Sequence, residues 1–276
     1  MSVVAVIGAT GKQGGSVIRQ LLRSTKWKVR GVTRNLDGAK AQSLSREGVE
    51  MVYGDVNDES SLLRAFEGAT AVFAVTTFWE SIPILGIEGA GEAEVQQYIN
   101  LAKAAAATST LHHYILRAYT SNLAEFPMLR FVPIPGSGNY AFVAPSSPSA
   151  LFALAGDMET NCGIVVEGIL NAGSEAFGKI AICITDYIPF KDVVTEFARV
   201  TGKSAVYLEI SDDDIAKIWG PFGSELASQL RWGEHYSEWA SFSPGRVISL
   251  EELNVSDKLV HFRQAMENLK DRLVQV

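Results

Sequence analysis

The chain has 276 residues, of which 47% are apolar and 20% are charged, and its formal net charge at pH 7 is −7. This length suits one large domain, or a domain with a smaller lobe, and the composition is that of a globular protein. The acidic balance argues against nucleic-acid binding through bulk electrostatics, and no apolar stretch approaches the roughly 18 residues that would span a membrane.

The cysteines and the first residues of the chain indicate in which cellular compartment the protein is expected. Cys162 and Cys183 are the two cysteines, which fits reducing conditions. Cys183 lies in the apolar run 180–184, where packing in a core strand is favoured over reactivity. Because the first predicted strand begins at Val3, no room remains for a signal peptide, and a soluble cytoplasmic protein is expected.

The first stretch of the chain predicts a strand, a glycine turn and a helix. Apolar residues 3–7 have the length of a buried strand, and Gly8, Gly11 and Gly14 follow at intervals of three. Apolar side chains then share one helical face, namely Val17, Ile18, Leu21 and Leu22. Glycines in this context favour dinucleotide binding, since the backbone approaches a pyrophosphate and the free N–H groups of the helix point at the anion.

Strands and helices alternate as far as residue 117. Strands are expected at 28–33, 49–53, 71–75 and 113–117. Helices are expected at 39–47, at 59–66 with Asp58 as the N-cap, and at 91–107. This alternation with short connections predicts an α/β fold with a doubly wound parallel sheet, whose ligands bind beyond the carboxyl ends of the strands.

The second half of the chain is less regular. Residues 120–156 show no long periodic segment, which favours a binding loop or a mobile region. The later elements are expected as helices at 157–170, 189–201, 212–219 and 223–232 and as strands at 179–185 and 205–209. The apolar stripe in the tail, Phe262, Met266, Leu269 and Leu273, is interpreted as packing rather than as a partner site.

The residues at the predicted strand ends favour NADP(H) over NAD(H). In NAD-binding proteins an acidic residue about 20 positions beyond the glycines holds the ribose 2′-hydroxyl. Arg34 stands in that place with Asn35 beside it, and Lys12 adds a positive charge from the glycine loop. An arginine pairs with a 2′-phosphate, whereas the alternative is that Arg34 is a solvated strand-end residue.

Two further strand ends complete the predicted cofactor site. Asp55 can bond the adenine amino group and Val56 can pack on the ring, although a turn role for Asp55 after Gly54 is as strongly favoured. The expected cofactor-binding residues are Gly8, Thr10, Gly11, Lys12, Gln13, Gly14, Arg34, Asn35, Asp55, Val56, Thr76 and Thr77.

These residues together resemble the NmrA-like family, atypical relatives of the short-chain dehydrogenases and reductases. The motifs that carry the resemblance are 8–14, 32–35, 54–56 and 72–76, with weaker matches at 119–123, 157–163, 178–180 and 200–203. The resemblance implies a Rossmann NAD(P)-binding domain over residues 1–125 and a smaller C-terminal substrate or partner lobe over 126–276, with the strand near 179–185 returning to the main sheet. Some family members look like NADPH-dependent reductases, and others resemble redox sensors that regulate a partner protein.

The chain departs from the family pattern after its fifth strand. The family has a further helix there, often with a lysine near the nicotinamide, and then a sixth strand. Here the segment 112–115 runs within a few residues into 117–123, which leaves no room for a crossover of about 10–12 residues. We therefore expect a sheet shorter by one strand and one helix, with an uncovered edge that makes a homodimer plausible.

Proton donors are few in the sequence. The one Tyr-x-x-x-Lys match, Tyr187 to Lys191, has Pro189 inside it and is rejected as a catalytic pair. His112, His113, Tyr114 and Tyr119 lie near the expected carboxyl edge and are weak catalytic candidates, with plain alternation of inward and outward side chains as the favoured alternative. Neither the histidines nor the cysteines show metal-ligand spacing, so no metal is expected.

Two functions remain open from the sequence. The first is hydride transfer from NADPH to a small carbonyl or conjugated substrate, or a redox-neutral rearrangement in the same pocket. Its pocket is expected from Phe78, Trp79, Tyr119 and Asn122, with Phe126 and Phe131 adding apolar surface. The second is a non-catalytic NADP(H) redox sensor that regulates a partner protein, which the missing lysine and crossover favour.

Overall fold

The computed structural model describes residues 2–117, 131–236 and 245–274. It divides into two units. The first comprises Met1–Tyr119, Met158–Ala181 and Arg246–Lys258, and the second comprises Thr120–Asp157, Ile182–Gly245 and Leu259–Val276. The first unit therefore includes two segments from the C-terminal half of the chain, and the predicted domain boundary at residue 125 lies outside the described residues.

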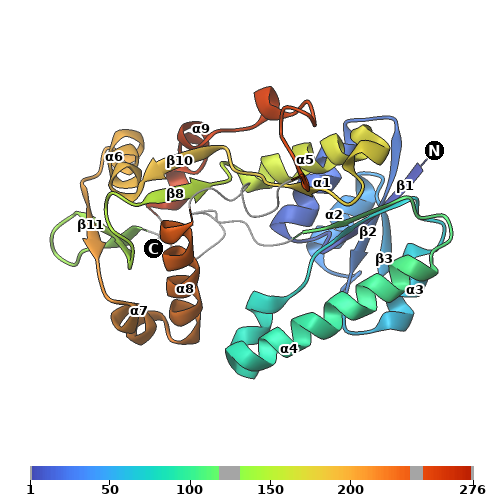
Figure 1. Ribbon diagram of the computed structural model, residues 1–276, viewed down its shortest axis with the longest axis horizontal. Coiled ribbons are helices and arrows are strands. Elements are labelled where there is room, and N and C mark those ends of the chain that lie inside the picture. The colour runs from blue at the N-terminus through green and yellow to red at the C-terminus, as the bar shows by residue number, and fades with distance from the viewer. Residues whose placement is uncertain (1, 118–130, 237–244, 275–276) are drawn as a thin grey trace. The chain divides into compact units, whose positions relative to one another are not determined.

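The first unit is built on a parallel sheet of five strands in the order β3-β2-β1-β4-β5 (Figure 1). Its strands are β1 Ser2–Ile7, β2 Trp27–Thr33, β3 Glu50–Tyr53, β4 Ala71–Ala74 and β5 His113–Leu116. β1 pairs with β2 from Ser2 opposite Trp27 to Ile7 opposite Val32, so these two strands end side by side. The structure thus confirms the predicted α/β fold and doubly wound sheet.

Helices cover both faces of this sheet (Figure 1). The helices are α1 Lys12–Leu22, α2 Ala39–Arg46, α3 Glu59–Phe66, α4 Phe78–Ala107 and α5 Met158–Ala172. On one face Ala5 and Ile7 of β1 share a buried apolar cluster with Phe66 of α3 and Leu101 of α4. Because successive side chains of a strand point to opposite faces, β1 also presents Val4 and Val6, both fully buried, to the other face.

Helix α5 packs tightly against α1, although the two are far apart in the sequence. The Ser16 hydroxyl donates to the carbonyl of Thr160 at 3.1 Å and accepts the backbone N–H of Gly163 at 2.9 Å. A Cβ on Gly163 would overlap the carbonyl oxygen of Ser16. This contact explains why α5 belongs to the first unit.

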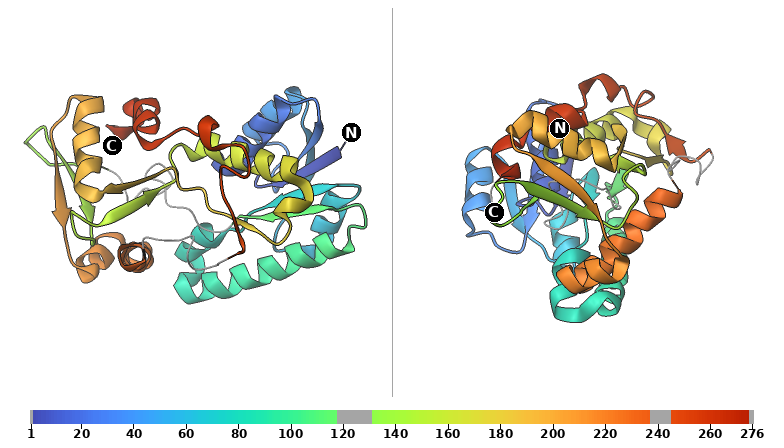
Figure 2. Two further views of the ribbon diagram at one scale, coloured as in Figure 1. Left: turned by 45° about the horizontal axis from the view of Figure 1, so that its top comes forward. Right: turned by 90° about the vertical axis from the view of Figure 1, so that its left-hand side faces the viewer.

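Helix α4 begins earlier than the predicted range 91–107. It starts at Phe78 and consists of two helical segments joined at Gly86, whose φ of 71° and ψ of 180° are not helical. Figures 1 and 2 show the short first segment set at an angle to the long second segment. Pro83 and Gly86 hid the first segment from a prediction based on helical periodicity.

No helix within the described ranges is both long enough and apolar enough to cross a membrane.

The connection after β5 was predicted to lack one crossover. Among the described residues between β5 and α5, namely 117 and 131–157, the structure contains strands and no helix. Residues 118–130 lie outside the described part, so the shorter sheet stays a prediction. The strand expected at 179–185 is reduced to β9 Ile180–Ala181, which pairs with β12 Val247–Ile248 in a separate two-stranded sheet rather than joining the main one.

The second unit holds small sheets around an aromatic core. Its elements are β6 Phe131–Pro133, β7 Tyr140–Ala144, β8 Leu151–Leu154, β10 Asp186–Pro189, β11 Ala205–Glu209, α6 Phe190–Thr201, α7 Asp212–Trp219, α8 Pro221–His235, α9 Phe262–Asn268 and α10 Lys270–Leu273. β11 pairs in parallel with β7, β6 pairs antiparallel with β7, and β8 pairs with β10. Phe152 stacks on Phe190 with ring centroids 4.6 Å apart. Short 3-10 turns at Gly173–Ala176 and Ser256–Lys258 belong to the first unit.

The second half of the chain differs from the prediction in residues 131–154 and agrees with it in its tail. The irregular structure expected over 120–156 is wrong for residues 131–154, because β6 pairs with the neighbouring β7, and β7 and β8 pair with the distant strands β11 and β10. The tail stripe is confirmed as packing, since Phe262, Met266 and Leu269 are buried. Cys183 is buried as expected, although it lies outside a strand, and burial raises the pKa of its thiol to about 12.

Candidate functional site

The glycine turn between β1 and α1 requires glycine at two positions. Gly8 has a φ of 69°, a left-handed conformation that side chains disfavour, and a Cβ there would lie 2.9 Å from Cγ2 of Val75. A Cβ on Gly14 would overlap the carbonyl oxygen of Gly8. The turn is closed by the backbone N–H of Gly11, which donates to the Gly8 carbonyl at 2.9 Å. The backbone therefore stays bare where a ligand phosphate approaches.

The amino end of α1 suits an anion. Gly11 is its N-cap, with no side chain capping the helix, and its first turn has no acidic residue. The partial positive charge of a helix amino end attracts phosphate, and bare glycine backbone lets the phosphate come close. Thr10, Lys12 and Gln13 occupy this turn and the first positions of the helix, as the sequence predicts. These residues fit the pyrophosphate of a dinucleotide.

Lys40 is a neighbour of the glycine turn that the sequence did not single out. Its Nζ donates to the carbonyl of Thr10 at 3.3 Å from the first turn of α2. Lys40 thus adds a second cation beside the turn, together with Lys12. The signal available in the sequence was a lysine just after Gly38, at the start of the helix that follows β2.

Arg34 lies at the carboxyl end of β2, as the sequence predicts, but it has a partner. Its Nη2 lies 2.9 Å from Oε2 of Glu80, in the first turn of α4. The Arg34 side chain is 54% exposed and that of Glu80 is 65% exposed. Asn35 shapes the same loop, because its Oδ1 accepts the backbone N–H of Asp37 at 3.1 Å.

The loop after β3 is held by hydrogen bonds of its own. Oδ1 of Asp55 accepts the backbone N–H and the side-chain amide of Asn57, at 2.9 and 3.0 Å. Val56 is 5% exposed, belongs to the core cluster, and accepts a hydrogen bond at its carbonyl from Asn100 Nδ2 at 3.0 Å. The turn role that the sequence left open for Asp55 is thus visible in its bonds to Asn57.

Gln97 of α4 connects the loops after β3 and β4. Its side chain is buried, its Oε1 accepts the backbone N–H of Thr77 at 2.9 Å, and its Nε2 donates to Thr77 Oγ1 at 2.8 Å and to Asn57 Oδ1 at 3.1 Å. The neighbouring Thr76 donates its hydroxyl to Glu94 Oε1 at 2.5 Å. Sequence reasoning missed Gln97, whose signal was a polar residue one turn before the buried Leu101 in a predicted helix.

The expected substrate pocket is described only in part. Phe78 and Trp79 follow Thr77 and meet edge to face, with ring centroids 5.6 Å apart. Tyr119, Asn122 and Phe126 lie outside the described residues. Phe131 does not line a pocket, because it is 5% exposed and stacks on Phe197 in the core of the second unit.

Of the expected proton donors, His112, His113 and Tyr114 do not gather at the carboxyl edge, and Tyr119 lies outside the described residues. His113 pairs with Ala71, the first residue of β4, so His112 and His113 lie at the amino edge of the parallel sheet. The ring of His113 packs edge to face on Phe177 at 4.9 Å. Tyr114 packs on the core cluster, and its buried hydroxyl has no hydrogen-bond partner among the described residues. Burial raises the pKa of Tyr114 to about 12.

The rejected Tyr187 to Lys191 match does not form a helical pair. Tyr187 lies in strand β10, whereas Lys191 lies in α6 beyond Pro189.

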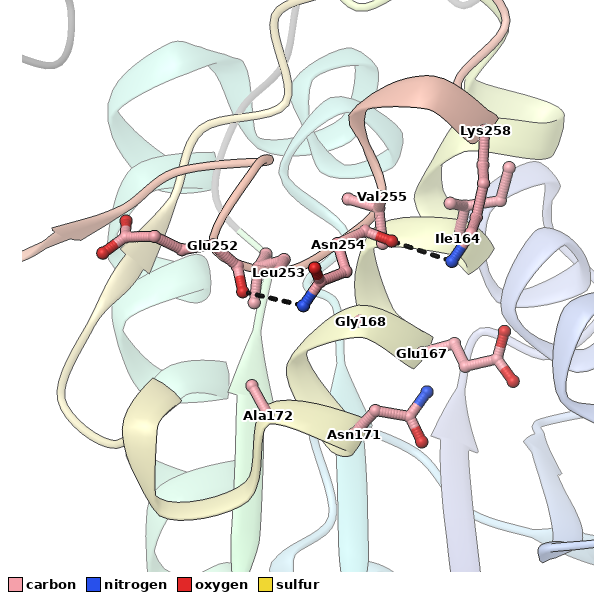
Figure 3. A pocket seen from close by; sticks show the side chains of 10 residues that line it. All are labelled: Ile164, Glu167, Gly168, Asn171, Ala172, Glu252, Leu253, Asn254, Val255 and Lys258. Carbon is pink, nitrogen blue, oxygen red and sulfur yellow. Dashed lines mark hydrogen bonds between the residues drawn. The ribbon is translucent and has the colours of Figure 1, made fainter.

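A small pocket elsewhere is formed by α5 and residues 252–258 (Figure 3). Its polar groups bond within the protein: Glu167 accepts from Gln20 at 2.7 Å, and Lys258 donates to the Asn254 carbonyl at 2.8 Å. No residue of the strand ends lines this pocket.

Comparisons with known proteins find relatives of this chain. The model of the NmrA-like family matches residues 1–117. The chain is similar to the NmrA-like family domain-containing oxidoreductase himF of Aspergillus japonicus, with 35% identity over 86% of this chain and 86% of the relative. Similarity to cpsB of Aspergillus campestris, which has the same description, is 28% over 83% of this chain and 81% of the relative.

Solved structures with the same fold include NmrA, a negative transcriptional regulator. Its complex with NAD gives a TM-score of 0.76 at 18% identity, and its complex with NADP gives 0.74 at 20%, each covering 98% of this chain and 96% of NmrA. The triphenylmethane reductase of Citrobacter sp., solved with NADP(H), gives 0.65 at 18%, covering 97% of this chain and 99% of the reductase. At these identities the likeness shows the fold.

Proposed function

The chain belongs to the NmrA-like family, and we propose that it binds NADP(H) at the carboxyl end of its parallel sheet and reduces a small carbonyl or conjugated substrate. The observation that carries the proposal is the bare glycine turn leading into the uncapped α1, with Arg34 at the end of the adjacent strand β2. Bound NADPH supplies the hydride, so the protein has to bind and orient the two reactants.

Each part of the site has a role in this proposal. The pyrophosphate lies against the amino end of α1, where Gly8 and Gly14 keep side chains out of the way. Arg34 bonds the 2′-phosphate, which is the reason for preferring NADP(H), since a carboxylate at this strand end would repel it. NmrA has been solved with both NAD and NADP, which supports a dinucleotide without choosing between the two.

The substrate side of the proposal depends on aromatic residues. Phe78 and Trp79 follow the Thr76–Thr77 loop directly and offer apolar surface next to it. Such a surface suits a flat, weakly polar substrate, and it excludes water from the hydride path. The resemblance in fold to a reductase that has been solved with NADP(H) supports reduction as the reaction class.

A regulatory function is the second candidate, because the expected proton donors that lie within the described residues are away from the carboxyl edge. His113 is at the amino edge of the sheet, and the hydroxyl of Tyr114 is buried in the core. In this alternative NADP(H) binds without turnover and a partner protein responds to the bound state, which requires different affinities in the two states. The resemblance in fold to a negative transcriptional regulator supports it.

Two measurements test the proposal. NADPH oxidation is followed with a panel of ketones and enones, while calorimetry measures the binding of NADP⁺, NADPH and NAD⁺. Turnover on any panel member supports the reductase, whereas tight binding with no turnover supports the sensor. Arg34→Asp is expected to shift the preference toward NAD⁺, and equal binding of both dinucleotides by parent and variant would remove Arg34 as the selecting residue.

A further inference from the structure

Arg34 already has an anionic partner in this structure. Nη2 of Arg34 lies 2.9 Å from Oε2 of Glu80, which makes the carboxylate of Glu80 a counter-ion for the guanidinium. Glu80 comes from a different part of the fold, the first turn of α4, which follows β4 rather than β2. The group expected to receive a 2′-phosphate is therefore the same group that pairs with Glu80.

This pair is arranged so that a phosphate can displace the carboxylate. Both side chains are more than half exposed, and pairs of this kind are typically worth about 0–1 kcal/mol because water screens them. A 2′-phosphate offers three acceptor oxygens and about two negative charges, and it can take two parallel N–H bonds from a guanidinium. A phosphate therefore competes well for Arg34, although it has to replace Glu80 and then tolerate its charge nearby.

The side chain of Glu80 can turn away from Arg34, because 65% of it is exposed. Its helical segment, residues 78–85, is joined to the rest of α4 at Gly86, where the backbone has a φ of 71° and a ψ of 180°. This conformation is accessible essentially to glycine alone, and a Cβ at Gly86 would meet nothing within 4 Å. Gln97 of the long second segment bonds Thr77, the N-cap of the first segment, and Ile82 of the first segment is buried, so the movement that the inference needs is confined to the Glu80 side chain.

We propose that Glu80 is a specificity-determining residue of the dinucleotide site: it is the internal counter-ion that a 2′-phosphate must displace from Arg34, so it weakens NADP(H) binding relative to NAD(H). The inference depends on the proposed dinucleotide function. It concerns a residue that is distinct from the predicted cofactor-binding set.

The test compares dinucleotide affinities of the parent and of Glu80→Gln, which keeps the shape of the side chain and removes its charge. Calorimetry at low ionic strength is expected to show NADP⁺ binding about three- to tenfold tighter in the variant, with NAD⁺ changed by less than about twofold. The gain in NADP⁺ affinity is expected to shrink as salt is added, because exposed charges are screened. Glu88→Gln, an exposed carboxylate of α4 on the other side of Gly86, is the matched control and leaves both affinities unchanged.

A double variant tests whether Glu80 acts through Arg34. In an Arg34→Gln background the gain from Glu80→Gln is expected to fall below about twofold, because the pair that the phosphate must break is gone. An unchanged gain there, or an unchanged ratio of NADP⁺ to NAD⁺ affinity in Glu80→Gln itself, would overturn the inference while the dinucleotide function stands. If the parent binds neither NADP⁺ nor NAD⁺, the proposed function fails and the inference fails with it.

Discussion

Gln97 holds Thr77 twice, accepting its backbone N–H at 2.9 Å and donating to its hydroxyl at 2.8 Å. The same side chain reaches Asn57 after β3, so one buried amide connects two of the loops that form the carboxyl edge of the sheet. These loops lie at the edge where ligands of doubly wound sheets bind. The position of these two loops thus depends on Gln97, which bonds them from helix α4.

Replacing Gln97 with alanine is expected to destabilise the protein and loosen this edge. Three hydrogen bonds are lost, and the Thr77 N–H is left without its partner in a poorly solvated position, which we expect to cost about 2–3 kcal/mol in free energy of unfolding. Urea unfolding followed by tryptophan fluorescence measures the loss. Dinucleotide affinity is expected to fall in the same variant, in calorimetry carried out well below its unfolding midpoint.

The adjacent Gln96 provides the control for this prediction. It is exposed on the same helix, and its Nε2 donates to Oδ1 of Asn100 at 2.9 Å. Gln96→Ala removes one hydrogen bond and is expected to cost about 1 kcal/mol, less than Gln97→Ala, and to leave dinucleotide affinity unchanged. If the two variants unfold at the same urea concentration, Gln97 does not fix the loops.

Most helices and strands of the first 117 residues were predictable because their signals are local, the first segment of α4 being the exception. A run of apolar residues, three glycines and an amphipathic segment specify β1, the turn and α1 within about 20 residues of sequence, and the later strands repeat the pattern. Asp58 was predicted as the N-cap of α3, and its side chain does accept the backbone N–H groups of Ser60 and Ser61. Each of these features depends on neighbours only a few positions away.

The features that sequence reasoning missed depend on distant partners. β7 pairs with β11, which lies more than sixty positions later, so a short strand between glycines and prolines carried no visible signal. The Arg34–Glu80 pair depends on where α4 begins and how it bends at Gly86, and neither is encoded in helical periodicity. His113 was expected near the carboxyl edge, but the register of β5 against β4 puts it at the opposite end of the strand.

The glycine turn gives a second prediction. In Gly14→Ala the new Cβ overlaps the backbone carbonyl of Gly8, which cannot move without opening the turn. We expect the variant to lose about 3 kcal/mol or more in free energy of unfolding. Under conditions where it stays folded, we expect it to bind NADP⁺ more than about tenfold more weakly.

Gly91→Ala is the matched control, because Gly91 is inside α4 and an added Cβ there would meet nothing within 4 Å. Alanine at this position is expected to stabilise the helix by about 0.5–1 kcal/mol. A Gly14→Ala protein with parental stability and affinity would contradict this account of the turn.

The third prediction separates packing from catalysis at Tyr114. Its hydroxyl is buried without a described partner, so Tyr114→Phe removes an unsatisfied polar group and is expected to raise the free energy of unfolding by about 1 kcal/mol. Burial raises the pKa of Tyr114 from 10.0 to about 12, so below pH 10 the phenol is neutral in both the folded and the unfolded chain. As the pH rises toward 12 the unfolded chain ionises first, and the parent loses stability that the phenylalanine variant retains.

The stability difference between Tyr114→Phe and the parent is therefore expected to widen above pH 10, in urea unfolding measured at pH 8 and at pH 11. A matched control is Tyr53→Phe, whose exposed side chain at the end of β3 is expected to change stability little at pH 8. Any turnover found in the substrate panel is expected to survive in Tyr114→Phe, because a side chain packed on the core cluster does not reach a substrate. A variant that is more stable but has lost NADPH oxidation would instead return Tyr114 to the list of proton donors.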